Sequence, residues 1–135
     1  MKTILVAGGC GFIGSNFLNI IKERHPDIEF VNIDKLDYCS NIHNVNSGVA
    51  KFIQHNLCNV GILENIVKEY KFDYVFHFAA QSHVDNSFTS PLGFTLDNTY
   101  GTHTLVEVCR RHIPNVEFIH FSTDEVYGES KTDEP

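Results

Sequence analysis

The sequence predicts a doubly wound α/β fold, in which helices cover both faces of a parallel β-sheet. Five short apolar runs alternate with segments whose apolar residues recur at helical spacing, which is the pattern of this fold class. A glycine-rich stretch from Gly8 to Gly14 joins the first apolar run to the first helical segment. Right-handed crossovers between such strands favour a parallel sheet.

Each predicted element follows from local periodicity and from turn residues. The predicted strands are residues 3–7, 28–33, 51–55, 73–80 and 117–121. Run 73–80 is almost continuously apolar, which is typical of a central strand covered on both faces. The predicted helices follow the glycine stretch as far as His25, run from an N-cap at Asn59 to Tyr70, and span residues 92–112, where Gly101 indicates close packing. Residues 37–48 and 81–91 are expected to be loops, and residues 129–135 a loose polar tail.

The composition indicates one ordinary soluble domain, residues 1–135. Hydrophobic residues make up 42% of the chain and charged residues 20%. Ten Lys and Arg against 17 Asp and Glu give a net charge of -7, which disfavours nucleic acid and anionic membranes as partners. We find neither a signal peptide nor an apolar run of spanning length, so the expected location is the cytoplasm.

The cysteines and histidines do not form a recognisable metal motif. Cys10, Cys39, Cys58 and Cys109 lie far apart and are expected to be small buried apolar residues. The eight histidines lack metal-ligand spacing. His77 and His120 fall in predicted strands, where we expect them to be packed and hydrogen-bonded. No metal site is predicted.

The glycine stretch is a candidate phosphate site. Gly8 can take backbone angles that side chains forbid, Gly11 lets the main chain approach a pyrophosphate, and Gly14 lets the helix pack closely on the strand. The helix N-terminus offers N–H groups and partial positive charge to an anion. The spacing G-x-x-G-x-x-G is a variant of the dinucleotide fingerprint, and the alternative is a tight turn without a ligand.

Asp34 ends the second predicted strand, 20 residues beyond Gly14. A dinucleotide fold places an acceptor for the adenosine ribose hydroxyls at this point. The carboxylate would repel a 2′-phosphate, which favours NAD over NADP, although Lys35 weakens that preference. A solvent-facing turn residue is the alternative interpretation of Asp34.

Thr123, Asp124 and Glu125 follow the fifth predicted strand. Two adjacent acids in a partly dry cleft repel each other's charge, so one can stay protonated while the other is ionised. The triplet could therefore supply an acid and a base. An acidic surface loop is the alternative.

Four ordered motifs carry a family resemblance. They read GGCGFIGS at residues 8–15, DKLDYCSN at 34–41, FAAQSHVDNS at 78–87 and STDEVYG at 122–128. The chain resembles the nucleotide-sugar 4,6-dehydratases, which are extended short-chain dehydrogenases with a Rossmann-type domain. The second motif is most similar to the UDP-glucose enzymes that begin UDP-rhamnose synthesis, followed by the dTDP-glucose enzymes.

The resemblance implies a reaction and its residues. Bound NAD would take hydride from C4 of the hexose, water would leave across C5 and C6, and the hydride would return to C6. Thr123 would hydrogen-bond the C4 hydroxyl, Asp124 would protonate the departing C6 hydroxyl, and Glu125 would take the C5 proton. Sugar 4-epimerases lack the Asp-Glu pair, and related decarboxylases usually carry Ser in place of Asp124.

The resemblance also implies a set of binding residues. Besides Gly8, Gly11 and Gly14, the cofactor contacts carry over to Phe12, Ile13, Asp34, Lys35, Leu36, Asp37, Asn56, Leu57, Phe78, Ala79, Ala80 and Gln81. Ser82 and Thr123 would contact the substrate. Two positions depart from the family pattern: Asn56 replaces an Asp that accepts from the adenine amino group, and Asp97 replaces a common Thr.

Family members place a Tyr-x-x-x-Lys pair and a substrate domain beyond the Thr-Asp-Glu stretch, and the full-length enzymes are expected to be homodimers. We therefore expect the 135 residues to form an NAD-binding half that does not turn over alone. The alternatives are a catalytically inactive nucleotide-binding module and a related epimerase or decarboxylase. The fifth strand is expected to be an exposed edge that favours self-association.

Overall fold

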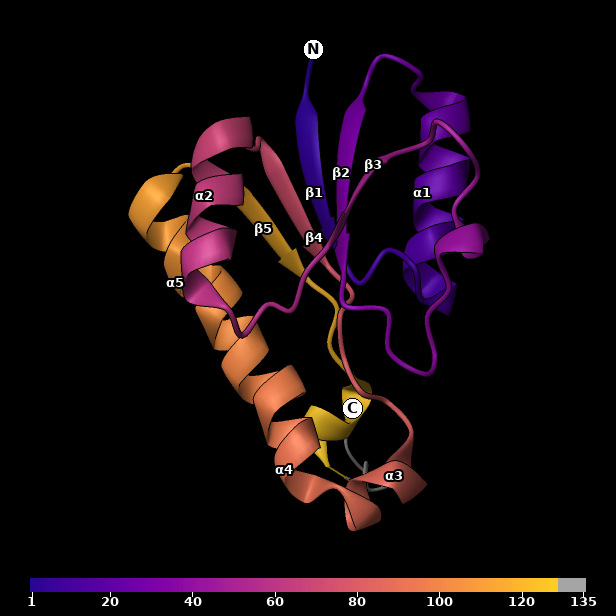
Figure 1. Ribbon diagram of the computed structural model, residues 1–135, viewed down its shortest axis with the longest axis vertical. Coiled ribbons are helices and arrows are strands. Elements are labelled where there is room, and N and C mark those ends of the chain that lie inside the picture. Colours follow the sequence, from indigo (N-terminus) through magenta and orange to yellow (C-terminus); the bar gives the residue numbers. More distant parts are fainter. Residues whose placement is uncertain (129–135) are drawn as a thin grey trace, which may run out of the picture.

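A computed structural model describes residues 1–128 and contains one five-stranded parallel sheet. The strand order is β3-β2-β1-β4-β5, which confirms the predicted doubly wound fold (Figure 1). The polar tail predicted for residues 129–135 lies outside the described residues. The strands are β1 (Thr3–Ala7), β2 (Glu29–Asp34), β3 (Lys51–Gln54), β4 (Tyr74–His77) and β5 (Glu117–His120).

Helices lie on both faces of the sheet. Helix α1 (Phe12–Arg24) covers one face, and α2 (Val60–Tyr70) and α5 (Thr102–His112) cover the other (Figure 1). The chain first builds the sheet from β1 outward to β3 and then returns to add β4 on the other side of β1. Such a reversal of strand order opens a crevice at the carboxyl ends of the strands, where ligands of this fold class bind.

Successive side chains of β1 point to opposite faces of the sheet and belong to two separate hydrophobic cores. Leu5 packs with the α2 and α5 side chains Leu63 and Leu105, and all three are fully buried. Val6, on the opposite face, packs with Leu18 of α1. Burying both faces explains why β1 is apolar at every position from Ile4 to Ala7.

The segment between β4 and β5 differs from the prediction. The expected loop 81–91 contains a short helix, α3 (Val84–Thr89). The expected helix 92–112 consists of α4 (Pro91–Phe94), the wide-turned π-helix η2 (Thr95–Gly101) and α5. A Cβ atom on Gly101 would lie 3.6 Å from Leu57 Cβ, which is ordinary contact, so the close packing expected there does not require glycine. Short 3₁₀ turns complete the chain at η1 (Ile42–Asn44) and η3 (Asp124–Tyr127).

One local prediction was confirmed and one was wrong in detail. Asn59 is the N-cap of α2 as predicted, although its side chain makes no cap hydrogen bond. Strand β4 ends at His77, three residues earlier than expected, and the chain continues as an extended loop at the edge of the crevice. On β4, Val75 is buried, whereas Phe76 on the α1 face is only half-buried although its ring lies 4.6 Å from that of Phe17 in α1.

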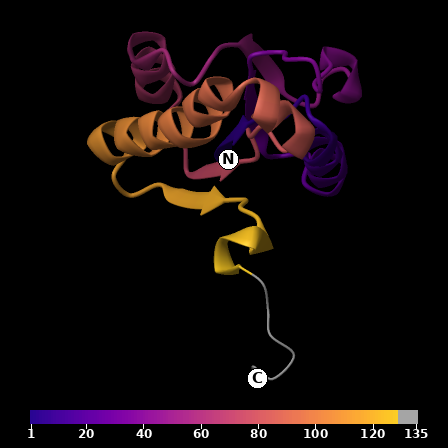
Figure 2. The same cartoon turned by 90° about the horizontal axis from the view of Figure 1, so that it is seen from below.

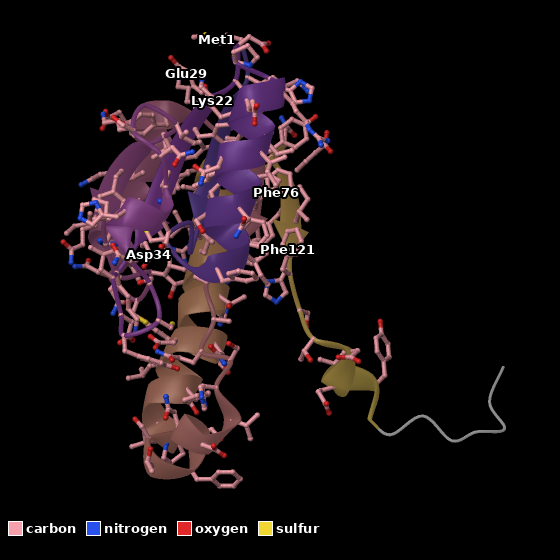
Figure 3. All side chains as sticks on the ribbon, turned by 90° about the vertical axis from the view of Figure 1, so that its right-hand side faces the viewer. Met1, Lys22, Glu29, Asp34, Phe76 and Phe121 are labelled. Carbon is pink, nitrogen blue, oxygen red and sulfur yellow. The ribbon has the colours of Figure 1, made fainter. Side chains whose placement is uncertain are left out.

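Aromatic side chains line this less covered face. Phe76 stacks with Phe121 at 6.4 Å between ring centroids, and Figure 3 shows both beside α1. Phe121 is 44% exposed. Figure 2 shows β5 at the edge of the sheet with η3 beyond it. The predicted apolar edge is therefore present in the structure.

The cysteines and the two strand histidines differ in burial. Cys10 and Cys109 are buried, whereas Cys58 is half-buried and Cys39 exposed, so the expectation was wrong for the last two. His77 is buried and its Nε2 lies 2.8 Å from Thr102 Oγ1. His120 is exposed, contrary to expectation, because β5 is an edge strand.

Within residues 1–128, no three His, Cys, Asp or Glu side chains group as metal ligands. In the same residues, no helix is long and apolar enough to cross a membrane.

Candidate functional site

A pocket lies at the carboxyl ends of β1, β2, β3 and β4. Figure 3 shows Asp34 at this end of the sheet, opposite Met1 and Glu29. The walls of the pocket come from five segments that are far apart in the sequence. The lining residues are Gly8, Ile33, Asp34, Lys35, Asp37, Cys39, Ser40, His55, Asn56, Leu57, Cys58, Phe78, Ala79, Ala80, Gln81, Asp97 and Gly101.

The glycine loop between β1 and α1 is closely packed. Gly8 has φ +82°, and a Cβ atom there would lie 2.5 Å from the backbone nitrogen of Ala79. A Cβ atom on Gly14 would lie 2.3 Å from the Gly8 carbonyl oxygen. Both positions therefore require glycine. Gly11 is the N-cap of α1 and makes no side-chain cap, so the first N–H groups of the helix can face an anion.

Asp34 connects this loop to the loop after β2. Its Oδ2 accepts from Cys10 N at 3.0 Å, while Oδ1 accepts from Leu36 N at 2.8 Å and from Ser40 Oγ at 3.0 Å. Leu36, which donates one of these hydrogen bonds, lies in the left-handed region of backbone conformation, at φ 60°. A carboxylate has about four acceptor positions, so Asp34 can still accept from a ligand hydroxyl.

Lys35 is held between two carboxylates. Its Nζ lies 2.7 Å from Asp37 Oδ2 and 2.6 Å from Asp97 Oδ2. Burial opposes the charge of Lys35, but the hydrogen bonds to both carboxylates outweigh it and raise the pKa of this lysine. The hydrogen bond from Lys35, aided by that from Tyr38 N, lowers the pKa of Asp37.

Gln81 completes the network and leaves one atom unpaired. Its Nε2 donates to Asp37 Oδ2 and to Asp97 Oδ2, at 2.8 Å each. Facing two carboxylates fixes the amide orientation, because the opposite orientation would place oxygen against oxygen. Gln81 Oε1 is buried and has no hydrogen-bond partner among the described residues. A ligand that donates a hydrogen bond would satisfy this atom.

Thr123, Asp124 and Glu125 lie outside the pocket lining. They begin η3, just after β5, where Thr123 Oγ1 accepts from Glu125 N at 3.2 Å and donates to Asp124 Oδ1 at 3.3 Å. All three are exposed, so the described residues do not form the partly dry cleft expected around the two acids. Ser82 is also exposed and outside the lining.

The comparisons with known proteins assign the family. A family model described as GDP-mannose 4,6 dehydratase matches residues 5–135. The chain belongs to this family. Solved structures that share its fold include both dTDP-glucose 4,6-dehydratases and UDP-glucose 4-epimerases, so the fold alone does not separate these two members of the wider group.

Three relatives illustrate the similarity. A trifunctional UDP-glucose 4,6-dehydratase, epimerase and reductase of Arabidopsis thaliana is 43% identical over 98% of this chain and 20% of its own length. The human dTDP-D-glucose 4,6-dehydratase is 45% identical over 96% of this chain and 38% of its own. The dTDP-glucose 4,6-dehydratase of Streptomyces venezuelae, solved with NAD bound, superposes with a TM-score of 0.85 at 33% identity, covering 97% of this chain and 42% of its own. The chain thus spans less than half of each relative.

The structure brings together many of the residues that the family resemblance suggested. The pocket gathers Gly8, Asp34, Lys35, Asp37, Asn56, Leu57, Phe78, Ala79, Ala80 and Gln81. The helix-start residues Gly11, Phe12, Ile13 and Gly14, together with Leu36, lie outside its lining. Phe12 and Ile13 are exposed.

Sequence reasoning missed several residues that shape the site. Asn32 is buried in β2, and its Oδ1 accepts from Gly9 N at 3.0 Å, which anchors the glycine loop. Asn98 binds the backbone of Gln81, and Ser40 binds Asp34. An asparagine inside an otherwise apolar strand was the one signal that could have revealed Asn32, because a buried amide needs a partner.

Proposed function

We propose that this chain binds NAD and forms the NAD-binding part of an NDP-glucose 4,6-dehydratase. One observation carries the proposal. The hydrogen bond from Cys10 N to Asp34 Oδ2 fixes the carboxylate against the glycine loop at the carboxyl end of the sheet, next to the start of α1. This arrangement offers N–H groups to a pyrophosphate and a carboxylate to a ribose. The close approaches at Gly8 and Gly14 support the same interpretation.

The residues of the pocket and of the adjacent start of α1 fit the cofactor chemically. The first turn of α1 would hold the pyrophosphate, and Asp34 would accept from the adenosine ribose. Asn56 and Leu57 would lie against the adenine; Asn56 Oδ1 already accepts from Cys58 N at 2.9 Å and can accept a second hydrogen bond. The unpaired Gln81 Oε1 would accept from a cofactor hydroxyl.

The proposed substrate is UDP-glucose or dTDP-glucose, and the product is the NDP-4-keto-6-deoxy sugar of rhamnose or deoxysugar synthesis. When bound, NAD supplies a hydride acceptor for C4 and then a hydride donor for C6. Thr123 would hydrogen-bond the C4 hydroxyl, Asp124 would protonate the departing C6 hydroxyl, and Glu125 would remove the C5 proton, which the C4 ketone acidifies. Ser82 would contact the substrate.

The acid at position 124 favours dehydration over the epimerase and decarboxylase alternatives. Elimination of water beside a ketone needs a proton donor for the leaving hydroxyl and a base for the carbon acid. Asp124 and Glu125 are adjacent in η3, which follows the strand next to β4.

We further propose a homodimer for the complete enzyme and a cytoplasmic location; the net charge of -7 is compatible with both.

Titration calorimetry of the 135-residue chain with NAD tests the binding proposal, with Asp34→Ala as the variant expected to lose affinity. Absence of heat and of thermal protection by NAD would contradict it.

A chimera tests the reaction. The 135 residues replace the matching segment of the human dTDP-D-glucose 4,6-dehydratase, with which they share 45% identity. We expect a 4-keto product from dTDP-glucose, and a rate lower by about 10²- to 10⁴-fold for Glu125→Gln. Glu117→Gln, at the exposed start of β5, is the matched control. A chimera that binds NAD but forms no 4-keto sugar would indicate the inactive nucleotide-binding module instead.

A further inference from the structure

Lys35 is the only lysine or arginine among the described residues that line the pocket. It directly follows Asp34, the residue at the ribose end of the proposed dinucleotide site. In folds of this class, a cation near this carboxylate accommodates the 2′-phosphate that distinguishes NADP from NAD. A free Lys35 would therefore be an available partner for that phosphate.

Lys35 is not free in this structure. Two carboxylates, Asp37 and Asp97, hold its ammonium group at 2.7 and 2.6 Å, and Gln81 donates to the same two oxygens. The side chain of Asp97 is only 17% exposed, against 36% for Asp37. Asp97 is thus the better shielded partner of Lys35, and its ion pair is less weakened by solvent.

The contact joins two parts of the chain that are 62 residues apart in sequence. Lys35 belongs to the loop after β2, whereas Asp97 comes from the wide-turned segment η2. The lining of this pocket contains three carboxylates, those of Asp34, Asp37 and Asp97, against the single ammonium group of Lys35, which pairs with the last two. The local charge therefore repels an additional phosphate.

We propose that Asp97 is a specificity-determining residue that, with Asp37, holds Lys35 away from the ribose and thereby excludes a dinucleotide that carries a 2′-phosphate. The inference rests on the proposed NAD-binding function. We call the two ion pairs of Lys35 with Asp37 and Asp97 the clamp. Removing the Asp97 carboxylate breaks the clamp and frees Lys35 to form a charge-assisted contact with the phosphate. Asp34 still disfavours that phosphate, so we expect the preference for NAD over NADP to become weaker but not to reverse.

The test compares NAD and NADP binding to the 135-residue chain by titration calorimetry. For Asp97→Asn we expect the ratio of NADP affinity to NAD affinity to rise by at least about threefold. Asp27→Asn removes the same charge at an exposed site at the opposite end of the sheet and is expected to leave the ratio unchanged. Circular dichroism and thermal melts check that each variant is folded, and Asp37→Asn, with a smaller expected rise, substitutes for Asp97→Asn if that variant does not fold.

Repeating each substitution in a Lys35→Met background tests whether Lys35 is needed for the effect. The alternative is that losing a negative charge near the site favours the phosphate by itself. If Lys35 mediates the preference, the rise disappears in this background. A rise that persists without Lys35, or equal changes in the NAD and NADP affinities, would overturn the clamp while leaving NAD binding intact. Failure of the unsubstituted chain to bind NAD would overturn the proposed function and this inference with it.

Discussion

The Asn98 side chain binds both backbone polar groups of Gln81. Its Oδ1 accepts from Gln81 N at 2.7 Å, and its Nδ2 donates to Gln81 O at 2.9 Å. The pair connects η2 to the loop after β4, so the pocket wall formed by Gln81 depends on a side chain from a different element. An amide can satisfy one donor and one acceptor at once in this way, as a neighbouring strand would.

Asn98→Ala is expected to destabilise the chain by about 1 to 3 kcal/mol, since it leaves two part-buried backbone groups without partners. The same change should weaken NAD binding, because Gln81 loses its support. Chemical denaturation and calorimetry measure the two effects. Asn115→Ala, in an exposed turn, is the control and should change neither.

Gly14→Ala is expected to disrupt the glycine loop. The added Cβ atom would lie 2.3 Å from the Gly8 carbonyl, a backbone atom that can move only with the loop itself. We expect a loss of about 1 to 3 kcal/mol in stability and little remaining affinity for NAD. Gly61→Ala offers a matched control, because nothing lies within 4 Å of its added Cβ atom. That variant should gain up to about 1 kcal/mol in α2. Equal effects at both positions would contradict the steric argument.

His77 is expected to make the stability depend on pH. Burial, together with the nearby His120, lowers the pKa of His77 from 6.5 to about 4. Between these values the unfolded chain binds a proton at His77 and the folded chain does not, so the free energy of unfolding falls as the pH falls from 6.5 to 4. The loss is on the order of 3 kcal/mol.

Urea unfolding at several pH values measures this dependence. His77→Gln should flatten the curve in that window, whatever its effect on the absolute stability. His25→Gln, at an exposed histidine, should leave the slope unchanged. An unaltered slope in His77→Gln would show that other groups cause the pH dependence.

The isolated 135-residue chain is expected to self-associate. Strand β5 is an edge of the sheet, and Phe121 and Phe76 present an apolar face beside it. Phe121→Asp should shift the chain toward monomer in light scattering, because it places a charge on this face. Phe88→Asp, at an aromatic that is 81% exposed on α3, should have a smaller effect. A clean monomer with a cooperative melt would contradict the expectation.

Local patterns predicted the elements well. Strand β1 has its predicted bounds, and four of the five strands lie within one residue of theirs at each end. The exception, β4, was predicted too long because Phe78, Ala79 and Ala80 are apolar and resemble strand residues, although they line the pocket. Likewise, the polar composition of residues 81–91 concealed α3, since a short helix at the surface needs no apolar stripe.

The order of strands and helices, the glycine loop and the position of Asp34 follow from the amino-acid sequence alone, because each depends on residues that are neighbours along the chain. Which side chains meet across the molecule depends instead on the three-dimensional fold. The anchoring of Gly9 by Asn32, the pairing of Asn98 with Gln81 and the clamp of Asp97 on Lys35 join residues 17 to 62 positions apart. Such contacts depend on how the elements pack, and periodicity within one segment carries no information about its partner in another.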